Sequence, residues 1–234
     1  MIIFFKRVFF CLFLTVLTSN LANAQEGESE LGAWYGFFWN TNFGSSDFGL
    51  TGDIQHRNYS VTNDFQQLIL RAGLSYNVKN TPLKVVAGYA YFNSGTFGES
   101  NSQLSENRLY QDALLDQQIG NRTYLTHRFR LEERFVEDQD FRTRFRYMLA
   151  VQVPLNQKTI TKNAVFFSAF SEIFINGQKD IGDGRSVPLF DRNWLFGGLG
   201  YVFTNTIRAQ VGYQRETTES FSKGQLIVGL FCKI

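Results

Sequence analysis

Residues 122–153 read RTYLTHRFRLEERFVEDQDFRTRFRYMLAVQV and contain two successive runs in which charged and apolar side chains alternate. In both runs the even positions carry the charges, and most odd positions are apolar. The charged residues at even positions are Arg128, Arg130, Glu132, Arg134, Arg142, Arg144 and Arg146. Because successive side chains of a β-strand point to opposite faces, the stretch predicts two strands, each with one charged and one apolar face.

Two classes of protein contain strands of this kind. A soluble sheet packs its apolar face on a core and turns its charged face to water. A transmembrane barrel turns its apolar face to lipid and its charged face to the lumen. The export signal and the cysteine content of the chain favour the membrane barrel.

The N-terminus has the three parts of a secretory signal peptide. Lys6 and Arg7 form a basic region, residues 8–17 are apolar, and Ala22-Asn23-Ala24 is an A-x-A cleavage motif. The apolar run is shorter than the roughly 20 residues that a membrane-spanning helix needs. We therefore predict a cleaved signal over residues 1–24, and a single β-barrel domain over residues 25–234 that begins at Gln25.

Charge and cysteine content limit the possible partners and the fold. The chain has 23 Lys and Arg and 21 Asp and Glu, so loss of Lys6 and Arg7 with the signal leaves 21 of each. A net charge of zero argues against a nucleic-acid partner, which usually requires a basic excess. Only Cys232 remains after cleavage, so no intramolecular disulfide can form. Small exported soluble domains often need disulfides, whereas a barrel closes its own hydrogen-bond network.

The remainder of the chain continues the alternating pattern, with turn residues between the alternating segments. These segments are predicted as strands at residues 31–40, 48–59, 65–78, 82–93, 106–119, 122–137, 140–153, 163–176, 190–203, 206–216 and 223–234.

The predicted connections differ in length and composition. Short ones contain Asn80-Thr81-Pro82, Gly120-Asn121 or Thr204-Asn205, whereas the connections at residues 94–105 and 176–189 are long and polar. Bacterial outer-membrane barrels have short periplasmic turns and longer outer loops. The two long loops are therefore expected on the outer side.

The number of strands is the uncertain part of the fold prediction. Eleven segments are recognisable, but single-chain bacterial barrels normally have an even number of strands. The difficulty lies before about residue 48, where the Gly-rich turn at residues 41–47 is hard to place. The predicted fold is an all-β, transmembrane, antiparallel up-and-down β-barrel of about 10–12 strands, and we favour twelve.

The polar faces of these strands collect charged residues into a candidate lumen charge network. Its members are Arg71, Arg108, Arg128, Arg130, Glu132, Arg134, Arg142, Arg144, Arg146, Glu172, Arg192 and Arg208. Arg57, Asp53, Asp112 and Asp116 lie on the same faces. Residues 122–137 and 140–153 form a tight hairpin, so Glu132 is expected close to Arg144 or Arg146.

This network has two interpretations. It could be a constriction that selects anions, or a fixed set of ion pairs that fills a narrow lumen. Barrels of about eight strands are filled by side chains, and open channels occur near sixteen strands. A barrel of intermediate size favours the fixed network.

Two glycines of the segment 190–203 share the inward face with Trp194 and Phe196. Small residues at Gly198 and Gly200 would allow large neighbours, such as Arg192 and Trp194, to lie across the strand. The alternative explanation is strand curvature alone.

The sequence offers no convincing catalytic, cofactor or metal site. His56 and His127 both fall on outward positions, whereas Ser168 and Glu172 share an inward face. A serine hydrolase requires a nucleophile, a base and an orienting acid close together. We therefore assign no catalytic, metal or cofactor-binding residue and do not expect an enzyme.

Four segments carry a family resemblance. They are Arg128–Phe135, Gly197–Phe203, Glu106-Asn107-Arg108 and Ala72–Tyr76. The chain resembles the family called domain of unknown function 2490 over essentially its whole mature length. The resemblance implies a small exported outer-membrane barrel of a kind common in Bacteroidota, with no established activity and no functional residues to carry over. The ending Phe231-Cys232-Lys233-Ile234 departs from the terminal aromatic residue of many outer-membrane barrels.

The sequence thus predicts a bacterial outer-membrane barrel with a non-enzymatic structural or accessory role. Outer-membrane lipid is the expected partner, and other envelope proteins are candidates. One alternative is a narrow channel for small anionic solutes, which unpaired arginines in the interior would favour. A second is a barrel lipid hydrolase, which would need an inward histidine beside Ser and an acid. A third is a soluble lipocalin-like binder, which would need polar outward faces.

Overall fold

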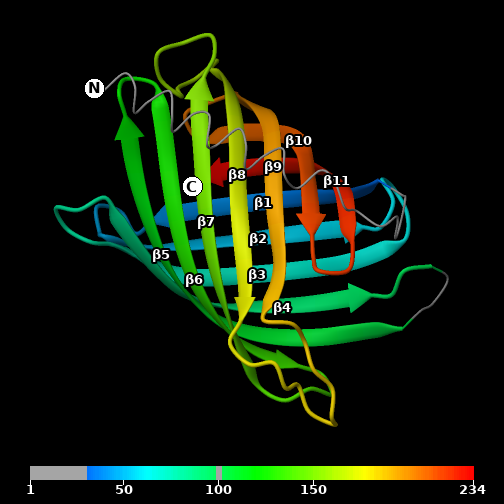
Figure 1. Ribbon diagram of the computed structural model, residues 1–234. Helices are drawn as coiled ribbons and strands as arrows, with labels where there is room; N and C mark the ends of the chain where they lie inside the picture. Colours follow the sequence, from blue (N-terminus) through cyan, green and yellow to red (C-terminus); the bar gives the residue numbers. More distant parts are fainter. Residues whose placement is uncertain (1–30, 99–101) are drawn as a thin grey trace, which may run out of the picture.

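The computed structural model describes residues 31–98 and 102–234, and in this part of the chain eleven strands close into a barrel (Figure 1). The predicted signal at residues 1–24 lies outside the described residues. The strands are β1 (Gly32–Asn42), β2 (Phe48–Asn58), β3 (Phe65–Asn77), β4 (Leu83–Gly95), β5 (Gln103–Ile119), β6 (Thr123–Val136), β7 (Arg142–Pro154), β8 (Val165–Asn176), β9 (Phe190–Val202), β10 (Ile207–Thr217) and β11 (Ser222–Lys233).

The all-β barrel is confirmed, and each predicted segment corresponds to one of these strands. The preference for twelve strands is wrong, and so is the expectation of antiparallel pairing throughout. Every sequential pair of strands is antiparallel, but β1 pairs with β11 in parallel. An odd number of alternating strands leaves the first and last running in the same direction, so only a parallel seam can close the barrel.

The parallel seam brings small and aromatic residues together. Gly36 of β1 lies opposite Gly229 of β11, and Phe38 lies opposite Phe231. The two Phe rings stack with their centroids 4.7 Å apart. The seam is therefore held by ring stacking as well as by its backbone hydrogen bonds.

The two ends of the barrel differ in their connections. We call the end that carries the β2–β3, β4–β5, β6–β7, β8–β9 and β10–β11 connections the loop end, and the opposite end, where β11 finishes, the C-terminal end (Figure 1). The three predicted short turns all lie at the C-terminal end. Asn80 and Gly120 there have φ angles of 59° and 60°, a backbone conformation that Asn and Gly tolerate well. Residues 155–164, also at this end, make a long connection that departs from the predicted pattern.

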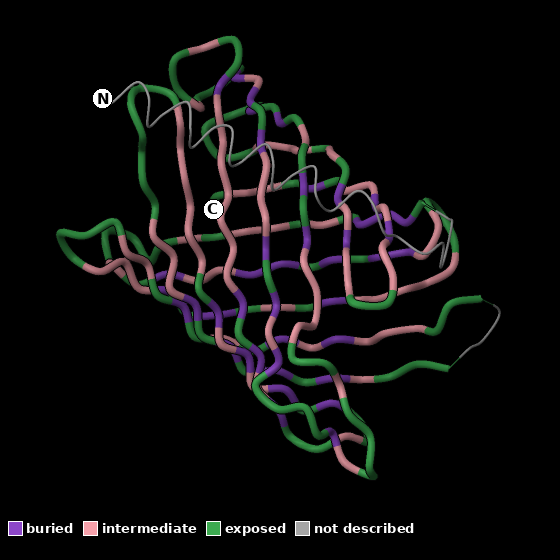
Figure 2. The backbone as a smooth tube through the Cα atoms, in the orientation of Figure 1, coloured by how far each residue is buried: buried purple, intermediate pink, exposed green. Residues whose placement is uncertain are grey.

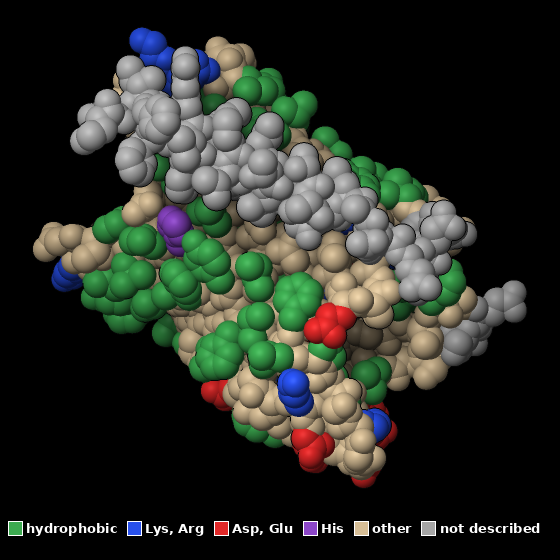
Figure 3. Space-filling model, in the orientation of Figure 1, with side chains coloured by type: hydrophobic (Ala, Val, Ile, Leu, Met, Phe, Trp, Pro, Cys, Tyr) green, Lys and Arg blue, Asp and Glu red, His purple; other side chains and the backbone are tan. Residues whose placement is uncertain are grey.

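The outer surface of the barrel is apolar along the strands. Large apolar side chains point outward and are exposed, including Leu109 (45%), Phe129 (55%), Phe145 (51%), Leu199 (50%) and Val211 (51%). Figure 3 shows hydrophobic side chains gathered on the face that it presents, with charged groups mainly in the lower part of the view. Buried positions of β2, β5, β6 and β7 lie mainly in the loop-end half of these strands, and in Figure 2 the connecting loops are largely exposed. No helix in residues 31–98 and 102–234 is long and apolar enough to cross a membrane.

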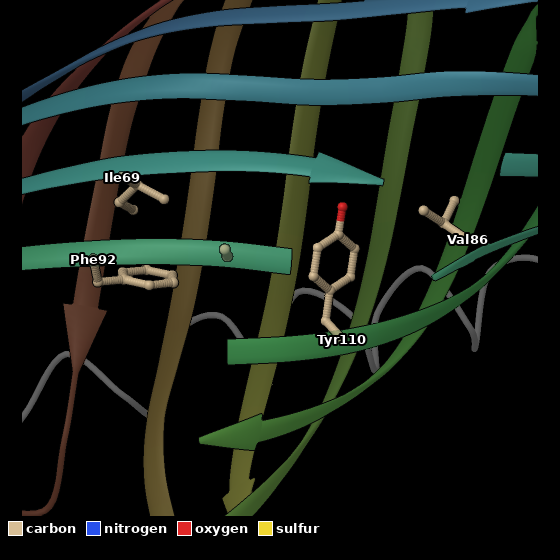
Figure 4. Packing of buried hydrophobic residues seen from close by; sticks show 5 residues of the cluster. Ile69, Val86, Phe92 and Tyr110 are labelled. Carbon is tan, nitrogen blue, oxygen red and sulfur yellow. The ribbon is translucent and has the colours of Figure 1, made fainter. Parts of the chain in front are cut away.

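The interior contains an apolar cluster beside a large number of charges. Ile69 of β3, Val86, Ala90 and Phe92 of β4, and Tyr110 of β5 are all at most 5% exposed and pack together. Figure 4 shows these side chains on three adjacent strands. The cluster fills one side of the lumen, and the charged side chains described below extend around the remaining wall.

Candidate functional site: the charged lumen

Glu132 is the centre of the charged interior. Its side chain is 2% exposed and lies among arginines from β5, β6 and β7. Arg144 Nη2 is 2.6 Å from Glu132 Oε2, and Arg146 Nη1 is 2.8 Å from Oε1. Arg108 and Arg130 approach the same carboxylate at 3.4 and 3.9 Å. Both arginines that the hairpin prediction placed near Glu132 therefore contact it.

Glu106 forms a second centre, closer to the loop end. Arg108 donates to both of its oxygens, at 2.6 and 2.7 Å. Arg134 does the same at 2.5 and 3.0 Å. Such two-pronged arginine–carboxylate pairs are among the strongest hydrogen bonds in proteins because both groups are charged and planar.

Two further carboxylates on the same wall have arginine partners. Arg130 donates to both oxygens of Asp112, each at 2.6 Å. Glu172 of β8 accepts hydrogen bonds from Arg128 at 2.7 Å and from Arg146 at 2.8 Å. Arg146 therefore links Glu132 to Glu172, and the pairs form one connected set across β5 to β8.

The connected set extends through β9 to β10. Arg144 donates to Asp191 at 2.6 Å, and Arg192 lies between Asp191 at 3.1 Å and Glu216 at 2.8 Å. The β8–β9 register shifts between Phe174 and Ile175. An irregularity of this kind interrupts the strict alternation of faces, so Asp191 reaches the interior from an odd position.

We call the inward, ion-paired layer in the loop-end half of the barrel the charged belt. Its carboxylates are Asp53, Glu106, Asp112, Glu132, Glu172, Asp191 and Glu216. Its arginines are Arg71, Arg108, Arg128, Arg130, Arg134, Arg144, Arg146 and Arg192. With one more cation than anion among these described residues, the charged belt is close to neutral.

Sequence reasoning missed three of the acidic partners, Glu106, Asp191 and Glu216, as members of the network. Glu106 and Glu216 share the inward parity of their strands, so the alternation alone could have identified them. Asp191 could not be found in this way because the strand irregularity changes its face. Asp116, placed on a charged face by its parity, is exposed and accepts a hydrogen bond from Thr126 at 2.6 Å.

Aromatic rings lie beside the charged belt and contact arginines from several strands of the barrel. The guanidinium of Arg57 on β2 lies 3.6 Å from the Trp34 ring centroid and 5.4 Å from that of Trp194 on β9. The two Trp rings meet edge to face, with centroids 4.8 Å apart. Arg146 of β7 lies 5.6 Å from the same Trp194 ring. Side chains from opposite walls therefore meet inside the barrel.

Three predicted lumen arginines have no acidic partner among the described residues. Arg57 hydrogen-bonds to the side chains of Gln55 and Gln67, at 2.9 and 3.0 Å. Arg142 is 6% exposed, and its buried Nε has no hydrogen-bond partner. Arg208, in the C-terminal half, has only a 3.4 Å hydrogen bond, to Gln152. Most of the cationic excess of the lumen thus lies outside the charged belt.

Glycine and phenylalanine lie against each other on the wall of the C-terminal half of the interior. A Cβ added at Gly200 would collide with the Phe166 ring, and one added at Gly198 or Gly212 with the Phe196 ring. The predicted neighbours of these glycines, Arg192 and Trp194, are not the groups that lie against them. Glycine instead lets aromatic rings lie close to the wall.

A cavity of about 860 Å³ remains inside the barrel. Its wall includes residues of the charged belt and, in the C-terminal half, Gly36, Phe38, Ala150, Gln152, Arg208 and Phe231. We call the part of the cavity lined by these last residues the C-terminal chamber. The two halves of the lumen therefore differ in charge and in the bulk of their side chains.

Neither histidine faces the lumen. His127 Nδ1 lies 2.9 Å from the Tyr147 hydroxyl, and Nε2 lies 3.3 Å from Gln117 Oε1. The ring of His56 contacts Phe65, with centroids 5.6 Å apart. Ser168 and Glu172 lie inside the barrel, away from both. Among the described residues, no group of His, Cys, Asp and Glu could hold a metal ion.

One acidic residue outside the strands ties two of them together. Glu137 follows β6 and accepts hydrogen bonds from the backbone N and the Oγ of Ser105, at 3.1 and 2.8 Å. These bonds favour the charged carboxylate and lower the pKa of Glu137 below its usual value.

The fold and the lumen together define a closed eleven-stranded β-barrel with an ion-paired interior. The chain matches the model of the protein family of unknown function DUF2490 over residues 31–226, and it belongs to that family. The resemblance seen in the sequence is thereby confirmed. No curated protein and no solved structure matches the chain.

Proposed function

We propose that the protein is a bacterial outer-membrane barrel with a non-enzymatic structural or accessory role in the cell envelope. In this proposal outer-membrane lipid surrounds the apolar outer face, and the charged belt is a fixed part of the fold. Other envelope proteins would meet the loops. The observation that carries the proposal is the contrast between the outward apolar faces and the ion-paired interior.

The outward faces support a membrane location. Exposed large apolar side chains occur on every strand, from Phe37 on β1 to Leu230 on β11. Soluble monomers rarely expose apolar patches beyond a few hundred Å², and a water-soluble lipocalin-like binder would need polar outward faces. In a bilayer the apolar outer surface would contact apolar lipid chains. A closed barrel also leaves no strand edge with unpaired backbone groups in the lipid.

The charged belt supports a structural role over free conduction. Its carboxylates are engaged by arginine, and Arg57 and Arg146 both reach the Trp194 ring from different walls. Moving an ion through this layer would require the paired groups to separate inside a low-dielectric interior, where unpaired charge is costly. We expect the resting barrel to conduct poorly.

Planar-bilayer recording of the refolded protein, without residues 1–24, tests this role. The proposal predicts folded barrels in the bilayer that show no discrete conductance steps. Insertion is verified independently by protease protection and by a heat-dependent shift in gel mobility. Regular open channels from verified, folded protein would contradict the structural role.

An anion channel is the second candidate, and one observation favours it. Arg57, Arg142 and Arg208 have no acidic partner among the described residues, so the lumen favours anions over cations. If the barrel does conduct, its reversal potential in a chloride gradient should show anion selectivity. A cation-selective current would exclude this candidate.

A further inference from the structure

Arg208 has the least satisfied guanidinium of the C-terminal chamber. It projects from β10 into the cavity wall and donates to Gln152 Oε1 on β7 at 3.4 Å. It also lies 5.1 Å from the Phe231 ring centroid and 5.9 Å from that of Phe166. It forms no ion pair in the described part of the chain. A side chain with five donors and one long hydrogen bond retains most of its capacity to bind an anion.

No acidic group of the chamber competes for this capacity. The carboxylates that line the cavity are Asp53, Glu106, Asp112 and Glu172, and each is paired with arginine in the charged belt. Asp116 lies toward the same end, but it is not part of the cavity wall. The remaining charged residues of the wall in this half are cations, Lys84 and Lys233.

The rest of the chamber offers apolar surface. Phe38, Phe170 and Phe231 line it, and Ala150 and Gly229 leave room between the rings. The amides of Gln152 and Gln210 lie beside Arg208. Other polar residues of the wall toward this end are Asn40, Thr51, Ser168, Thr204, Asn205 and Thr206. Small-molecule sites are typically cavities of about 300–1,000 Å³ with a few placed polar groups. The whole lumen cavity has a volume of about 860 Å³, and the C-terminal chamber is one part of it.

From this arrangement we infer that the C-terminal chamber binds an organic carboxylate with an apolar body. The carboxylate pairs with Arg208, and the amides of Gln152 and Gln210 provide further hydrogen bonds. The aromatic or aliphatic body lies against Phe38, Phe170 and Phe231. Arg208 supplies the guanidinium that pairs with the carboxylate, and Lys84 and Lys233 of the same half add positive charge. The Phe rings match an apolar body. Thr204 and Thr206 of the turn at the C-terminal end also line the cavity. The site does not depend on whether the lumen conducts.

Calorimetric titration of the refolded barrel in zwitterionic nanodiscs tests the site. The probe is 2-naphthoate, compared with its neutral analogue 2-naphthamide and with acetate, which has no apolar body. We expect 2-naphthoate to bind at least tenfold more tightly than either comparison compound. Equal affinity for naphthamide would overturn the role of Arg208, and equal affinity for acetate would overturn the role of the apolar wall.

Three variants locate the binding. Arg208→Gln should weaken 2-naphthoate binding at least about tenfold, because charge-assisted hydrogen bonds are lost. The matched control is Arg215→Gln, on the same strand but outward and bonded to Ser222 at 2.7 Å, which should bind as the wild type does. Ala150→Phe fills the chamber without removing Arg208, and it should also weaken binding.

Unchanged binding by folded Arg208→Gln and Ala150→Phe barrels would overturn the inference. Channel activity in the bilayer experiment would contradict the structural role and would leave this site standing, so the two proposals fail separately.

Discussion

The two halves of the barrel interior are packed with different kinds of side chain. In the loop-end half, charged side chains line the lumen, and nearly every carboxylate meets arginine from a neighbouring strand. In the C-terminal half, glycine lets aromatic rings lie against the wall. The cavity is lined by residues of both halves. The comparison shows that the role of an inward charge depends on its position in the barrel. In the charged belt, ion pairs link neighbouring strands. In the C-terminal chamber, Arg208 forms no ion pair among the described residues.

The largest effect should come from the centre of the charged belt. Glu132→Gln leaves Arg144 and Arg146 buried with their shared anionic partner lost, which typically costs about 3–5 kcal/mol in the free energy of unfolding. Denaturant unfolding in lipid or detergent, followed by Trp fluorescence, measures the loss. The control is Glu133→Gln, the adjacent outward residue, which forms no ion pair among the described residues and should change stability little. Equal stability of both variants would show that the ion pairs of the charged belt do not stabilise the loop-end half.

A steric substitution in the glycine-lined half should have an intermediate effect. Gly200→Ala places a methyl group where the Phe166 ring lies, and forced repacking of this kind costs about 1–3 kcal/mol. Gly197→Ala, on the outward face of the same strand, meets no atom within 4 Å and serves as the control. The same unfolding experiment should separate the two variants. A Gly200→Ala barrel as stable as the control would show that ring packing on glycine contributes little.

The charge of Arg208 should matter less for stability than that of Glu132. Arg208→Gln removes a cation that has no acidic partner among the described residues, so we expect a change of less than about 1 kcal/mol in the free energy of unfolding. The measurement is the denaturation midpoint without added ligand. A loss of stability as large as that of Glu132→Gln would mean that the charge of Arg208 stabilises the fold as much as the ion pairs of the charged belt do.

The smallest effect should come from Glu137, at the edge of the belt. Its pKa is lower when folded than when unfolded, so its hydrogen bonds to Ser105 stabilise the fold above the unfolded pKa. This contribution disappears as the pH falls through the lowered, folded pKa. Glu137→Gln should therefore reduce the unfolding midpoint slightly at pH 7 and converge with the wild type in acid. Asp138→Asn is the control, and a gap between Glu137→Gln and wild type that persists in strong acid would contradict the assignment.

The strands were largely predictable because alternation is a local property. Arg128 to Arg134 and Arg142 to Arg146 identified a hairpin whose pairing is observed. The parallel closure of β1 on β11 was not predictable in this way, because it depends on the total number of strands. The general rule of an even count led to the wrong preference for twelve.

In the lumen too, local contacts were predictable and long-range contacts were not. The alternation of side chains along a strand indicates which of them face inward, and the cross-strand contact of Glu132 with Arg144 followed from the hairpin register. The alternation does not indicate which side chains meet across the barrel, so the approach of Arg57 on β2 to Trp194 on β9 was not predicted. Asp191 was missed because a strand irregularity reversed its face.

A double-mutant cycle on Glu132 and Arg144 tests most directly whether the charged belt holds the fold together. Arg144 donates from Nε and Nη2 to one Glu132 oxygen, at 2.8 and 2.6 Å. The unfolding free energies of Glu132→Gln, Arg144→Gln and the double variant give the coupling between the two side chains. We predict a favourable coupling of about 1–3 kcal/mol, with the double variant losing less than the sum of the single variants. Additive losses would show that the pair contributes no interaction to stability and would contradict the structural role of the charged belt.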